Sequence, residues 1–523
     1  MTSLFDHEPW IKKVDLKLTP PSLKDNTADT DRLIKGVKKS LKTEKVHINL
    51  SLIKRLPHLL RESNYDVHCV LFEEDDVWQL TNISSARPDA LICGLAVDLG
   101  TSTIVIRLLD LLTGKALGET TFLNPQVEIG TDILTRIHFT REPSGLERLQ
   151  GVLIERLNQK IIGLCKTHDV DVSSIVGAAV AGNTTMTHLF LGLDPYWICR
   201  EPYIPVLNNP GLLTAKESGL GVMERAPVLI MPGVGSYLGG DLIAGVLASG
   251  LYQQKEPSIL VDVGTNAEVV LGNDEWLMAC AGAAGPALEG GVASMGMQAA
   301  PGVIDKFMIE PRSKAFQIRT IDHKPPIGIC GSGLIDLVAF LFLANMIDMR
   351  GKYVPDQCGK RLVVMDGIEH LVVVTESESG TGKALTLSQP DIDSLLRSKA
   401  AMYTILTTIA DMVSISLKDL SRFYIAGTFG AYIDPRSAIT LGMLPDLPIQ
   451  TYVPLGNTSL EGACMALLSS KARQKAYEIR DRITYIELNV NQEFMNHFSA
   501  ARFIPHTNRS LFPSVKEWRI LAG

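Results

Sequence analysis

The chain carries one short pattern twice, and this repeat constrains its fold more than any other feature of the sequence. The first copy is Leu95–Thr103 (LAVDLGTST) and the second is Leu260–Glu268 (LVDVGTNAE). In both copies an apolar strand reaches an aspartate, a Gly-Thr pair follows, and another strand returns. The two aspartates, Asp98 and Asp262, are 164 residues apart. Two matching hairpins, one in each half of a long chain, indicate a duplicated domain.

Each copy has the chemistry of a phosphate-binding hairpin. Glycine lets an anion approach the backbone, and turn N–H groups with Thr and Ser hydroxyls donate to it. An Asp at the end of the strand can hold Mg²⁺ or its waters beside that anion. One copy alone would be an ordinary hairpin turn with an edge carboxylate, whereas the pair predicts a nucleotide polyphosphate held from both sides. The expected magnesium ligands are Asp98 and Asp262, and the expected phosphate contacts are Gly100, Thr101, Ser102 and Thr103 in the first hairpin and Gly264, Thr265 and Asn266 in the second.

Composition excludes several other classes of protein. With 523 residues, 46% of them hydrophobic, the chain has material for two to four domains. A formal charge of -7 without a basic stripe argues against nucleic acid as a partner. The apolar stretches are too short to cross a membrane, and the N-terminus lacks the pattern of a signal peptide. We therefore expect a soluble, cytoplasmic protein with no membrane partner.

The eight cysteines show no spacing typical of an iron–sulfur or zinc site. No two of them are closer than 24 residues, so the chain contains no iron–sulfur cluster motif. We expect free thiols that are mostly buried. A cluster shared between two subunits, which would need only one or two isolated cysteines from each, stays open.

Changes in composition and in the spacing of apolar residues divide the chain into four parts. Residues 1–30 form an N-terminal arm or linker with a Pro-Pro break. Residues 31–90 form a small α/β module, with a helix over 31–41 and a hairpin of strands 66–72 and 77–83. Residues 91–256 and 257–523, each containing one copy of the repeat, form two lobes, and the C-terminal segment is a candidate for returning to the first lobe.

A third motif connects the paired hairpins to a known superfamily. Phe423–Tyr432 is a hydrophobic strand that runs into a Gly-rich turn. The two hairpins resemble the phosphate-1 and phosphate-2 motifs of the actin, sugar-kinase and heat-shock-chaperone ATPases, and this third segment resembles their adenosine motif. The resemblance implies an α/β fold: a duplicated ribonuclease-H-like, actin-like ATPase with two lobes around a nucleotide cleft, preceded by the small module. It also implies that Gly427, Thr428 and Gly430 contact the adenosine.

Longer motifs over nearly the whole chain resemble the ATPase domain of the reductive activators of corrinoid proteins. These motifs are Pro20-Pro21-Ser22-Leu23, Asn124-Pro125-Gln126 with Gly130-Thr131-Asp132, Gly182-Asn183-Thr184-Thr185-Met186, Gly239-Gly240-Asp241, the stretch from Ala284 to Gly291, Cys330-Gly331-Ser332-Gly333-Leu334-Ile335-Asp336, and Phe503-Ile504-Pro505-His506.

The family resemblance implies a function. Corrinoid methyl-transfer proteins work through Co(I), which is occasionally oxidised to inactive Co(II), and activators of this family couple its uphill reduction to ATP. The resemblance thus implies ATP and Mg²⁺ as cofactors, a corrinoid protein as partner, and a homodimer. Relatives typically carry an iron–sulfur domain ahead of the Pro20-Pro21 arm, and this sequence starts where that domain would end. Two alternatives stay open: the activator works without a cluster of its own and receives electrons from a separate redox protein or ferredoxin, or the iron–sulfur domain lies outside this sequence. For this chain itself we expect only the ATP-driven part of the reaction.

Three further places have a functional and a structural interpretation. Asp241 is a candidate catalytic carboxylate with Asp98 and Asp262, or a helix cap. Gly331, Ser332 and Gly333 begin an apolar helix, and they either bind a phosphate or ribose oxygen or allow close helix–strand packing. Lys399, on a helix over 391–414, either faces the adenine or is solvated.

Other functions remain open at this stage. A small-molecule kinase of the same superfamily would need a catalytic base, for which Asp241 or Asp132 could serve. A nucleotide-dependent scaffold or chaperone would bind a protein without any redox consequence. An activator of radical dehydratases would place a cluster between two subunits, and the second half could also be an inactive relic.

Overall fold

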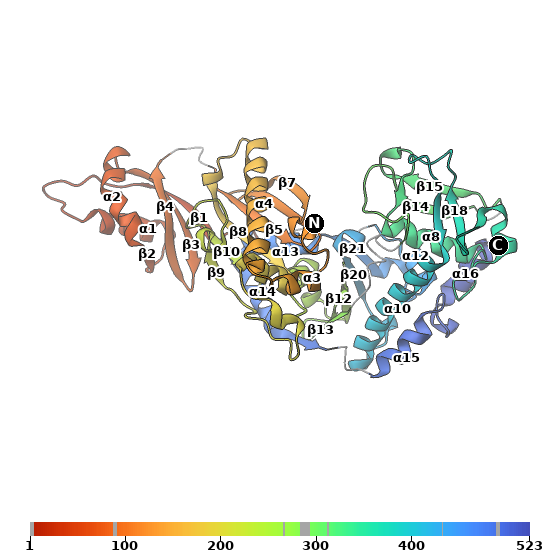
Figure 1. Cartoon of the computed structure of the whole chain (residues 1–523). Coiled ribbons are helices and arrows are strands. Elements are labelled where there is room, and N and C mark those ends of the chain that lie inside the picture. Colours follow the sequence, from red (N-terminus) through yellow and green to blue (C-terminus); the bar gives the residue numbers. More distant parts are fainter. Residues whose placement is uncertain are drawn as a thin grey trace. The chain divides into compact units, whose positions relative to one another are not determined.

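A computed structural model describes residues 5–86, 91–264, 267–282, 293–310, 313–430, 432–487 and 492–522 (Figure 1). The chain forms two compact units. Unit 1 contains Met1–Ala248 and Ser459–Asp481, and unit 2 contains Ser249–Thr458 and Arg482–Gly523. The chain therefore completes unit 1 only after it has passed through unit 2.

The N-terminal module of unit 1 is a four-stranded sheet, in the order β1-β3-β4-β2, with two helices. Helix α2 buries Leu52, Leu56 and Leu60, whose spacing of four residues places them on one face. Strand β1 pairs antiparallel with β3, so this part of the expected arm belongs to the module. The elements are β1 (Ile11–Lys17), α1 (Asp29–Leu41), β2 (Val46–Ile48), α2 (Leu50–Glu62), β3 (Asp66–Glu74) and β4 (Val77–Ser85).

The larger sheet of unit 1 has the order β7-β6-β5-β8-β10-β9. Its central strands β5, β8 and β10 are parallel and almost wholly buried, as expected for strands covered on both faces. The strands are β5 (Cys93–Leu99), β6 (Thr103–Asp110), β7 (Ala116–Leu123), β8 (Ile175–Gly182), β9 (Leu212–Thr214) and β10 (Pro227–Ile230). The helices of this part are α3 (Ile133–Phe139), α4 (Gly145–Thr167), α5 (Thr184–Leu191), α6 (Ala215–Ser218), α7 (Gly240–Ser249), α13 (Thr458–Leu468) and α14 (Ser470–Arg482).

The main sheet of unit 2 has the order β21-β20-β11-β12-β13-β22, and two three-stranded sheets, β15-β14-β16 and β17-β18-β19, accompany it. The main strands are β11 (Ser258–Val263), β12 (Ala267–Gly272), β13 (Leu277–Gly282), β20 (Arg422–Ala426), β21 (Tyr452–Gly456) and β22 (Ile483–Ile486). The small sheets consist of β14 (Val303–Ile309), β15 (Phe316–Thr320), β16 (Gly328–Ile329), β17 (Leu362–Met365), β18 (Ile368–Val374) and β19 (Leu385–Ser388). The helices are α8 (Gly331–Leu343), α9 (Pro355–Cys358), α10 (Gln389–Met412), α11 (Gly427–Gly430), α12 (Pro435–Leu441), α15 (Gln492–Ala501) and α16 (Pro513–Ala522).

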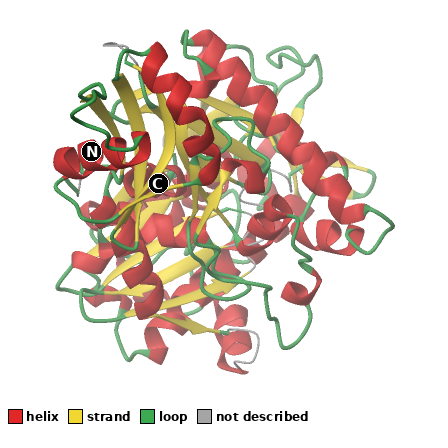
Figure 2. Ribbon diagram, turned by 90° about the vertical axis from the view of Figure 1, so that its left-hand side faces the viewer, coloured by secondary structure: helices red, strands yellow, loops and turns green. Residues whose placement is uncertain are grey.

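The two main sheets have the same connectivity around their repeat strands. In unit 1, β5 lies between the antiparallel β6 and the parallel β8; in unit 2, β11 lies between the antiparallel β12 and the parallel β20. Each repeat continues into a third antiparallel strand, β7 or β13. Sheets with helices packed on them are plain in Figure 2. The predicted fold class, a duplicated α/β domain preceded by a small module, is confirmed.

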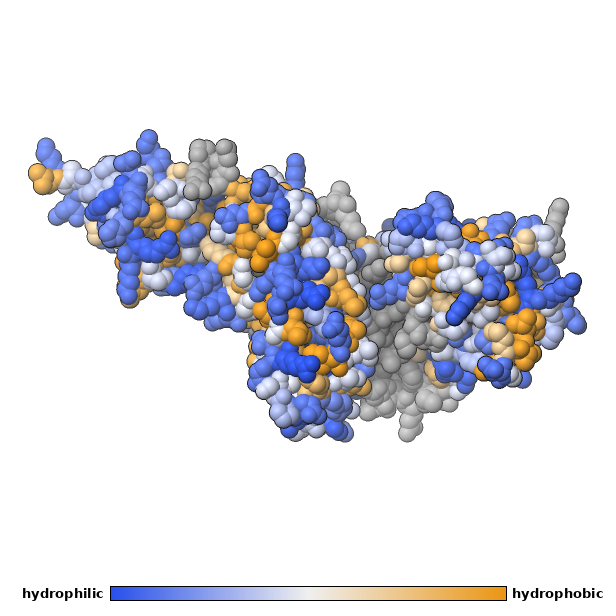
Figure 3. Space-filling model, turned by 45° about the horizontal axis from the view of Figure 1, so that its top comes forward, coloured by the Kyte–Doolittle hydropathy of each residue, from blue (hydrophilic) through white to orange (hydrophobic). Residues whose placement is uncertain are grey.

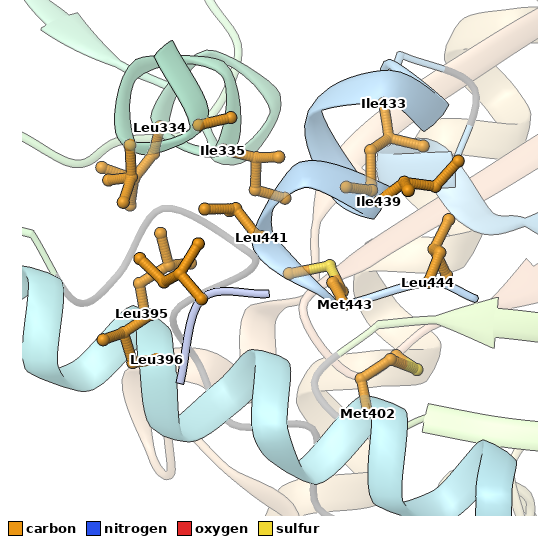
Figure 4. Close-up of a cluster of buried hydrophobic side chains, with 14 of the residues drawn as sticks. Leu334, Ile335, Leu395, Leu396, Met402, Ile433, Ile439, Leu441, Met443 and Leu444 are labelled. Atoms are coloured by element: carbon orange, nitrogen blue, oxygen red, sulfur yellow. The ribbon is translucent and has the colours of Figure 1, made fainter. Parts of the chain in front are cut away.

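A continuous apolar core holds the helices of unit 2 to its sheets. Figure 4 shows the part where α8, α10 and α12 meet, with Leu334 and Ile335 facing side chains from the other two helices. The face of the molecule shown in Figure 3 has groups of hydrophobic residues set among hydrophilic ones. Among the described helices none combines the length and the apolar character needed to cross a membrane.

All eight cysteines are free, and seven of them are buried while Cys199 is half-buried. Burial raises the pKa of the Cys280 and Cys464 thiols to about 12. A thiol with such a pKa is almost wholly protonated at neutral pH and is a poor nucleophile or metal ligand. The expectation of free, mostly buried thiols is confirmed.

Candidate functional site

The first hairpin closes tightly at the carboxyl end of β5. Asp98 is the penultimate residue of this strand, residues 100–102 make the turn, and β6 begins at Thr103. A Cβ atom on Gly100 would lie 2.2 Å from the carbonyl oxygen of Thr103, so no other residue fits there without moving the backbone. The backbone therefore makes a tight turn at Gly100, and phosphate binding by this hairpin stays a prediction.

Two other segments of unit 1 reach the same edge of the sheet. Because β5 and β8 are parallel and Asp98 is level with Ala181, their carboxyl ends lie side by side. Asn183 follows β8 and caps α5 by accepting the N–H of Met186 at 2.9 Å. A Cβ atom on Gly239 would come within 2.3 Å of the Asn183 Cα, so the start of α7 touches this cap.

Asp241 therefore lies near this edge, in the first turn of α7. It is half-buried, and its Oδ1 accepts the N–H of Leu242 at 2.8 Å. This position fits a structural role as well as a catalytic one. The helix dipole stabilises a carboxylate in the first turn of a helix, and the same carboxylate can contact a ligand beside it. Its catalytic role stays a prediction.

Side chains from three distant segments brace the first hairpin. The Asn124 amide donates to the carbonyl oxygen of Gly100 at 2.9 Å, and the Arg136 guanidinium donates to that of Thr101 at 2.8 Å. The Asn183 amide donates to the Thr101 hydroxyl at 3.0 Å. Asn124 and Asn183 belong to two of the family motifs, so the sequence marked both residues but did not predict that they support the hairpin. Nothing in the sequence pointed to Arg136.

Arg136 is wholly buried and acts as a rigid support under the hairpin. Its Nε also donates to the carbonyl oxygen of Gly130 at 2.8 Å, so one guanidinium joins two loops. Burial lowers the pKa of Arg136 to about 10, which still leaves it charged at neutral pH. A planar guanidinium can make these bonds in fixed directions, as a lysine could not.

A fourth residue contacts the aspartate itself. The Ser459 hydroxyl donates to Asp98 Oδ1 at 2.8 Å from the first turn of α13, in the segment that returns to unit 1. Sequence reasoning missed Ser459, because nothing local marks it and the contact spans 361 residues.

In unit 2, Asp262 lies beside the turn at Gly427, which belongs to the segment that resembles an adenosine motif. Asp262 is level with Ala426 on the parallel strand β20, and Gly427 follows with φ of +83°. A Cβ atom on Gly427 would lie 2.9 Å from both Asp262 Oδ1 and the carbonyl oxygen of Val263. Only glycine therefore lets the turn pass this close to the carboxylate. Gly264 ends the described part of the second hairpin; Thr265, Asn266 and the side chain of Thr428 lie outside the described residues.

The two aspartates occupy equivalent places. Each lies beside an alanine of the parallel neighbouring strand, Ala181 for Asp98 and Ala426 for Asp262, and a glycine follows each alanine. Carboxylates together with turn backbone groups are the oxygen donors and N–H groups that Mg²⁺ and phosphate need. Gly100 keeps a side chain out of the first hairpin turn, and Gly427 keeps one out of the turn that follows β20. The residues present thus fit a magnesium nucleotide. Gly430 packs against Ile425, which a Cβ would approach to 2.6 Å, and so it shapes the turn.

The start of α8 fits closely against β14. A Cβ atom on Gly333 would lie 2.5 Å from the carbonyl oxygen of Ile304, and the Ser332 hydroxyl donates to that of Asp305 at 3.3 Å. The packing interpretation of this glycine is therefore supported. A phosphate or ribose contact from Gly331, Ser332 and Gly333 stays a prediction.

Lys399 requires a correction. Its side chain is wholly buried, so it is neither solvated nor free to face a nucleotide. The Nζ donates to the carbonyl oxygens of Phe503 and Pro505 at 2.6 and 2.8 Å. Burial lowers its pKa well below the usual value. Lys399 thus anchors the C-terminal segment to α10.

Comparison with known families accounts for almost the whole chain. Residues 2–88 match the family model of the RACo linker region, and residues 93–254 match that of the RACo middle region. Residues 256–516 match the C-terminal domain of RACo, the ASKHA domain.

Individual relatives agree with these matches. The corrinoid activation enzyme RamQ of Eubacterium limosum is 29% identical over 94% of this chain and 82% of its own length. The [Co(II) methylated amine-specific corrinoid protein] reductase of Methanosarcina barkeri is 25% identical over 77% of this chain and 76% of its own. Among solved structures, a reductive activator for a corrinoid, iron–sulfur protein has a TM-score of 0.91 and 39% identity, covering 98% of this chain and 82% of that one. These relatives support an enzymatic role.

Proposed function

Since the chain belongs to the family of reductive activators of corrinoid proteins, we propose that it returns an inactive Co(II) corrinoid protein to Co(I) in an ATP-dependent step. The observation that carries this proposal is the pair of equivalent aspartate hairpins, at Asp98 and Asp262, within a chain that resembles such activators along its length. The names of two relatives, a corrinoid activation enzyme and a Co(II) corrinoid protein reductase, support the same substrate class.

In this proposal the hairpin residues bind Mg²⁺-ATP. The Asp98 carboxylate of the first hairpin and the Asp262 carboxylate of the second would serve as ligands of Mg²⁺ or of its waters and would orient the attacking water. Turn N–H groups and the hydroxyls of Thr101, Ser102 and Thr103 donate to phosphate oxygens. Gly427 and its neighbours leave room for the adenosine. Bound Mg²⁺-ATP supplies the binding and hydrolysis free energy.

The nucleotide must act by changing the affinity for the corrinoid partner. A ligand shifts a conformational equilibrium only by the difference between its affinities for the two states. ATP must therefore favour the state that binds the Co(II) partner, and hydrolysis must reset it. The reaction consumes one electron per cobalt, which we assign to an external low-potential redox protein. We also propose a homodimer, which light scattering would test.

An anaerobic absorbance experiment tests this function. A Co(II) corrinoid protein is mixed with titanium(III) citrate, and this protein and ATP are added singly and together. We expect the Co(I) band only when both are present, and we expect it to be absent with ADP or with an Asp98→Asn variant. A shift of the Co(II) band without Co(I) would show docking without an electron route. No spectral change with several corrinoid proteins would contradict the proposal and favour a scaffold.

A further inference from the structure

The hydroxyl of Ser459 makes a contact with one of the proposed magnesium ligands that no motif of the sequence explains. It is 5% exposed, and it donates to Asp98 Oδ1 at 2.8 Å. A hydroxyl has one O–H to donate, and in this structure that donor is directed at the carboxylate. A bond between a hydroxyl and a charged carboxylate is among the stronger hydrogen bonds.

Such a bond controls how the carboxylate is turned. The torsion that rotates an aspartate carboxylate about its own axis has a broad, shallow preference. A donor fixed to one oxygen narrows that rotation and thereby sets the direction of the other oxygen. Partners of metal-ligating side chains commonly act in this way, and losing them costs roughly 10- to 100-fold in metal affinity or activity.

The position of Ser459 is itself fixed, because α13 is anchored at several points within unit 1. The Glu461 carboxylate pairs with Arg107 of β6 at 2.6 Å. A Cβ atom on Gly462 would lie 2.1 Å from the carbonyl oxygen of Ala244, so α13 packs closely on α7. The indole N–H of Trp10 donates to the carbonyl oxygen of Ala466 at 2.9 Å. The hydroxyl is therefore presented by a rigid helix.

From these contacts we infer that Ser459 is a positioning residue, which orients the Asp98 carboxylate for Mg²⁺ binding. This inference rests on the proposed function, because it needs Asp98 to be a magnesium ligand. Ser459 contacts the carboxylate and acts on the metal only through it. Its removal should weaken metal binding while the affinity for nucleotide without metal stays the same.

The test measures metal binding directly. Mn²⁺, whose bound and free forms differ in electron paramagnetic resonance, is titrated into the full chain with a non-hydrolysable ATP analogue. We expect Ser459→Ala to weaken Mn²⁺ binding roughly 10- to 100-fold, and Ser459→Thr, which keeps the hydroxyl, to restore it to within a few-fold. Ser470→Ala is the matched control, because that serine starts the next helix and its hydroxyl donates to the Glu8 carbonyl oxygen at 3.4 Å instead of to a carboxylate.

The outcomes separate this inference from the proposed function. If wild-type protein binds no Mn²⁺ with the analogue, the proposed nucleotide site fails. If wild-type binds it and Ser459→Ala binds it equally well, only the role of Ser459 fails. Should Ser459→Ala unfold, Ser459→Cys keeps the volume with a weaker donor, and we expect it to bind Mn²⁺ less tightly than Ser459→Thr. Equal binding by the Cys and Thr variants would overturn the inference.

Discussion

The Asn183 side chain joins the end of one strand to the turn of another: its amide donates to the Thr101 hydroxyl at 3.0 Å while its carbonyl oxygen caps α5. One residue thus stabilises a helix and orients a proposed phosphate-binding hydroxyl. Substitutions can separate the two roles, because aspartate and serine also cap helices but lack the amide donor.

We expect Asn183→Asp to unfold at nearly the wild-type temperature but to bind ATP at least about tenfold less tightly, because it places a negative charge beside the proposed phosphate-binding hairpin. Asn183→Ser should retain more affinity, since it adds no charge, and Asn183→Ala should lose about 1 kcal/mol of stability with its cap. Thermal unfolding and a fluorescent ATP titration measure both effects. Wild-type ATP affinity in the Asp variant would show that Asn183 has only the capping role.

Arg136→Lys should destabilise unit 1 by about 2–4 kcal/mol, because an ammonium group cannot reach the carbonyl oxygens of both Gly130 and Thr101 in the geometry of the guanidinium. The first hairpin would lose its support, and ATP affinity should fall with it. Arg141→Lys is the control, since that side chain is 60% exposed and should change stability by no more than about 0.5 kcal/mol. Equal unfolding temperatures of the two variants would contradict the supporting role.

Gly427→Ala should abolish most ATP hydrolysis, because its Cβ would press against the Asp262 carboxylate at 2.9 Å. The variant also carries the backbone cost of a side chain at positive φ, about 1–2 kcal/mol. Gly367→Ala isolates that cost, because its φ is +78° and no atom lies within 4 Å of the added Cβ. We expect at least about a tenfold difference in the hydrolysis rate between the two variants, equivalent to about 1.4 kcal/mol. Similar hydrolysis rates in the two variants would show that Gly427 is not part of the proposed nucleotide site.

Asp336, in the first part of α8, makes unit 2 sensitive to pH. Burial raises its pKa to about 6, although the Ser437 hydroxyl donates to it. The folded chain thus holds this proton up to a higher pH than the unfolded chain does. Stability should fall as pH rises from about 4 to 6 and remain lower above that, by up to about 3 kcal/mol.

Asp336→Asn removes the charge, so we expect it to be more stable than wild type at pH 8 and about equal at pH 4. Denaturant midpoints at pH 4, 6 and 8 measure the difference. Asp356→Asn, at an exposed position on α9, is the control and should show no such trend. If the difference in stability between Asp336→Asn and wild type were the same at all three pH values, the Asp336 carboxyl would not change its charge between pH 4 and 8. That result would contradict the prediction.

Lys399→Met should loosen the C-terminal segment. Methionine matches the length of lysine but cannot donate, so the carbonyl oxygens of Phe503 and Pro505 lose this partner. We expect a net loss of about 1–3 kcal/mol and faster hydrogen exchange around residues 503–506. Lys418→Met, at an exposed position, should change neither. Unchanged exchange in the Lys399 variant would mean that other contacts hold the segment.

Local patterns predicted most of the elements. The β3–β4 hairpin was expected from its acidic turn, and Asp75 and Asp76 have the positive φ values, 48° and 61°, of a hairpin turn of the type that suits twisted strands. The helices at α1 and α10 begin within two residues of the predicted starts. Such elements follow from residues that are neighbours in sequence.

Contacts between segments that are far apart in the sequence were harder to predict. The strand in the expected arm joins the module because Val14 pairs with Cys69, and no local pattern contains that register. For the same reason the sequence did not predict the roles of Arg136 and Ser459, whose hydrogen-bond partners are far away in the sequence. Lys399 was misjudged because lysines are rarely buried without an acidic partner, and here backbone carbonyl oxygens take that place.

The return of α13 to unit 1 has a consequence for synthesis on the ribosome. Asp98 is translated 361 residues before Ser459, which at about 5–20 residues per second is a delay of roughly 20–70 s. During that time the nascent N-terminal part lacks the helix that contacts the aspartate, and all of Ser249–Thr458 is made in between. A chain released after the second hairpin but before Ser459 would keep both hairpins in its sequence yet leave Asp98 without its serine, so premature termination there yields a protein whose proposed metal ligand lacks its positioning contact.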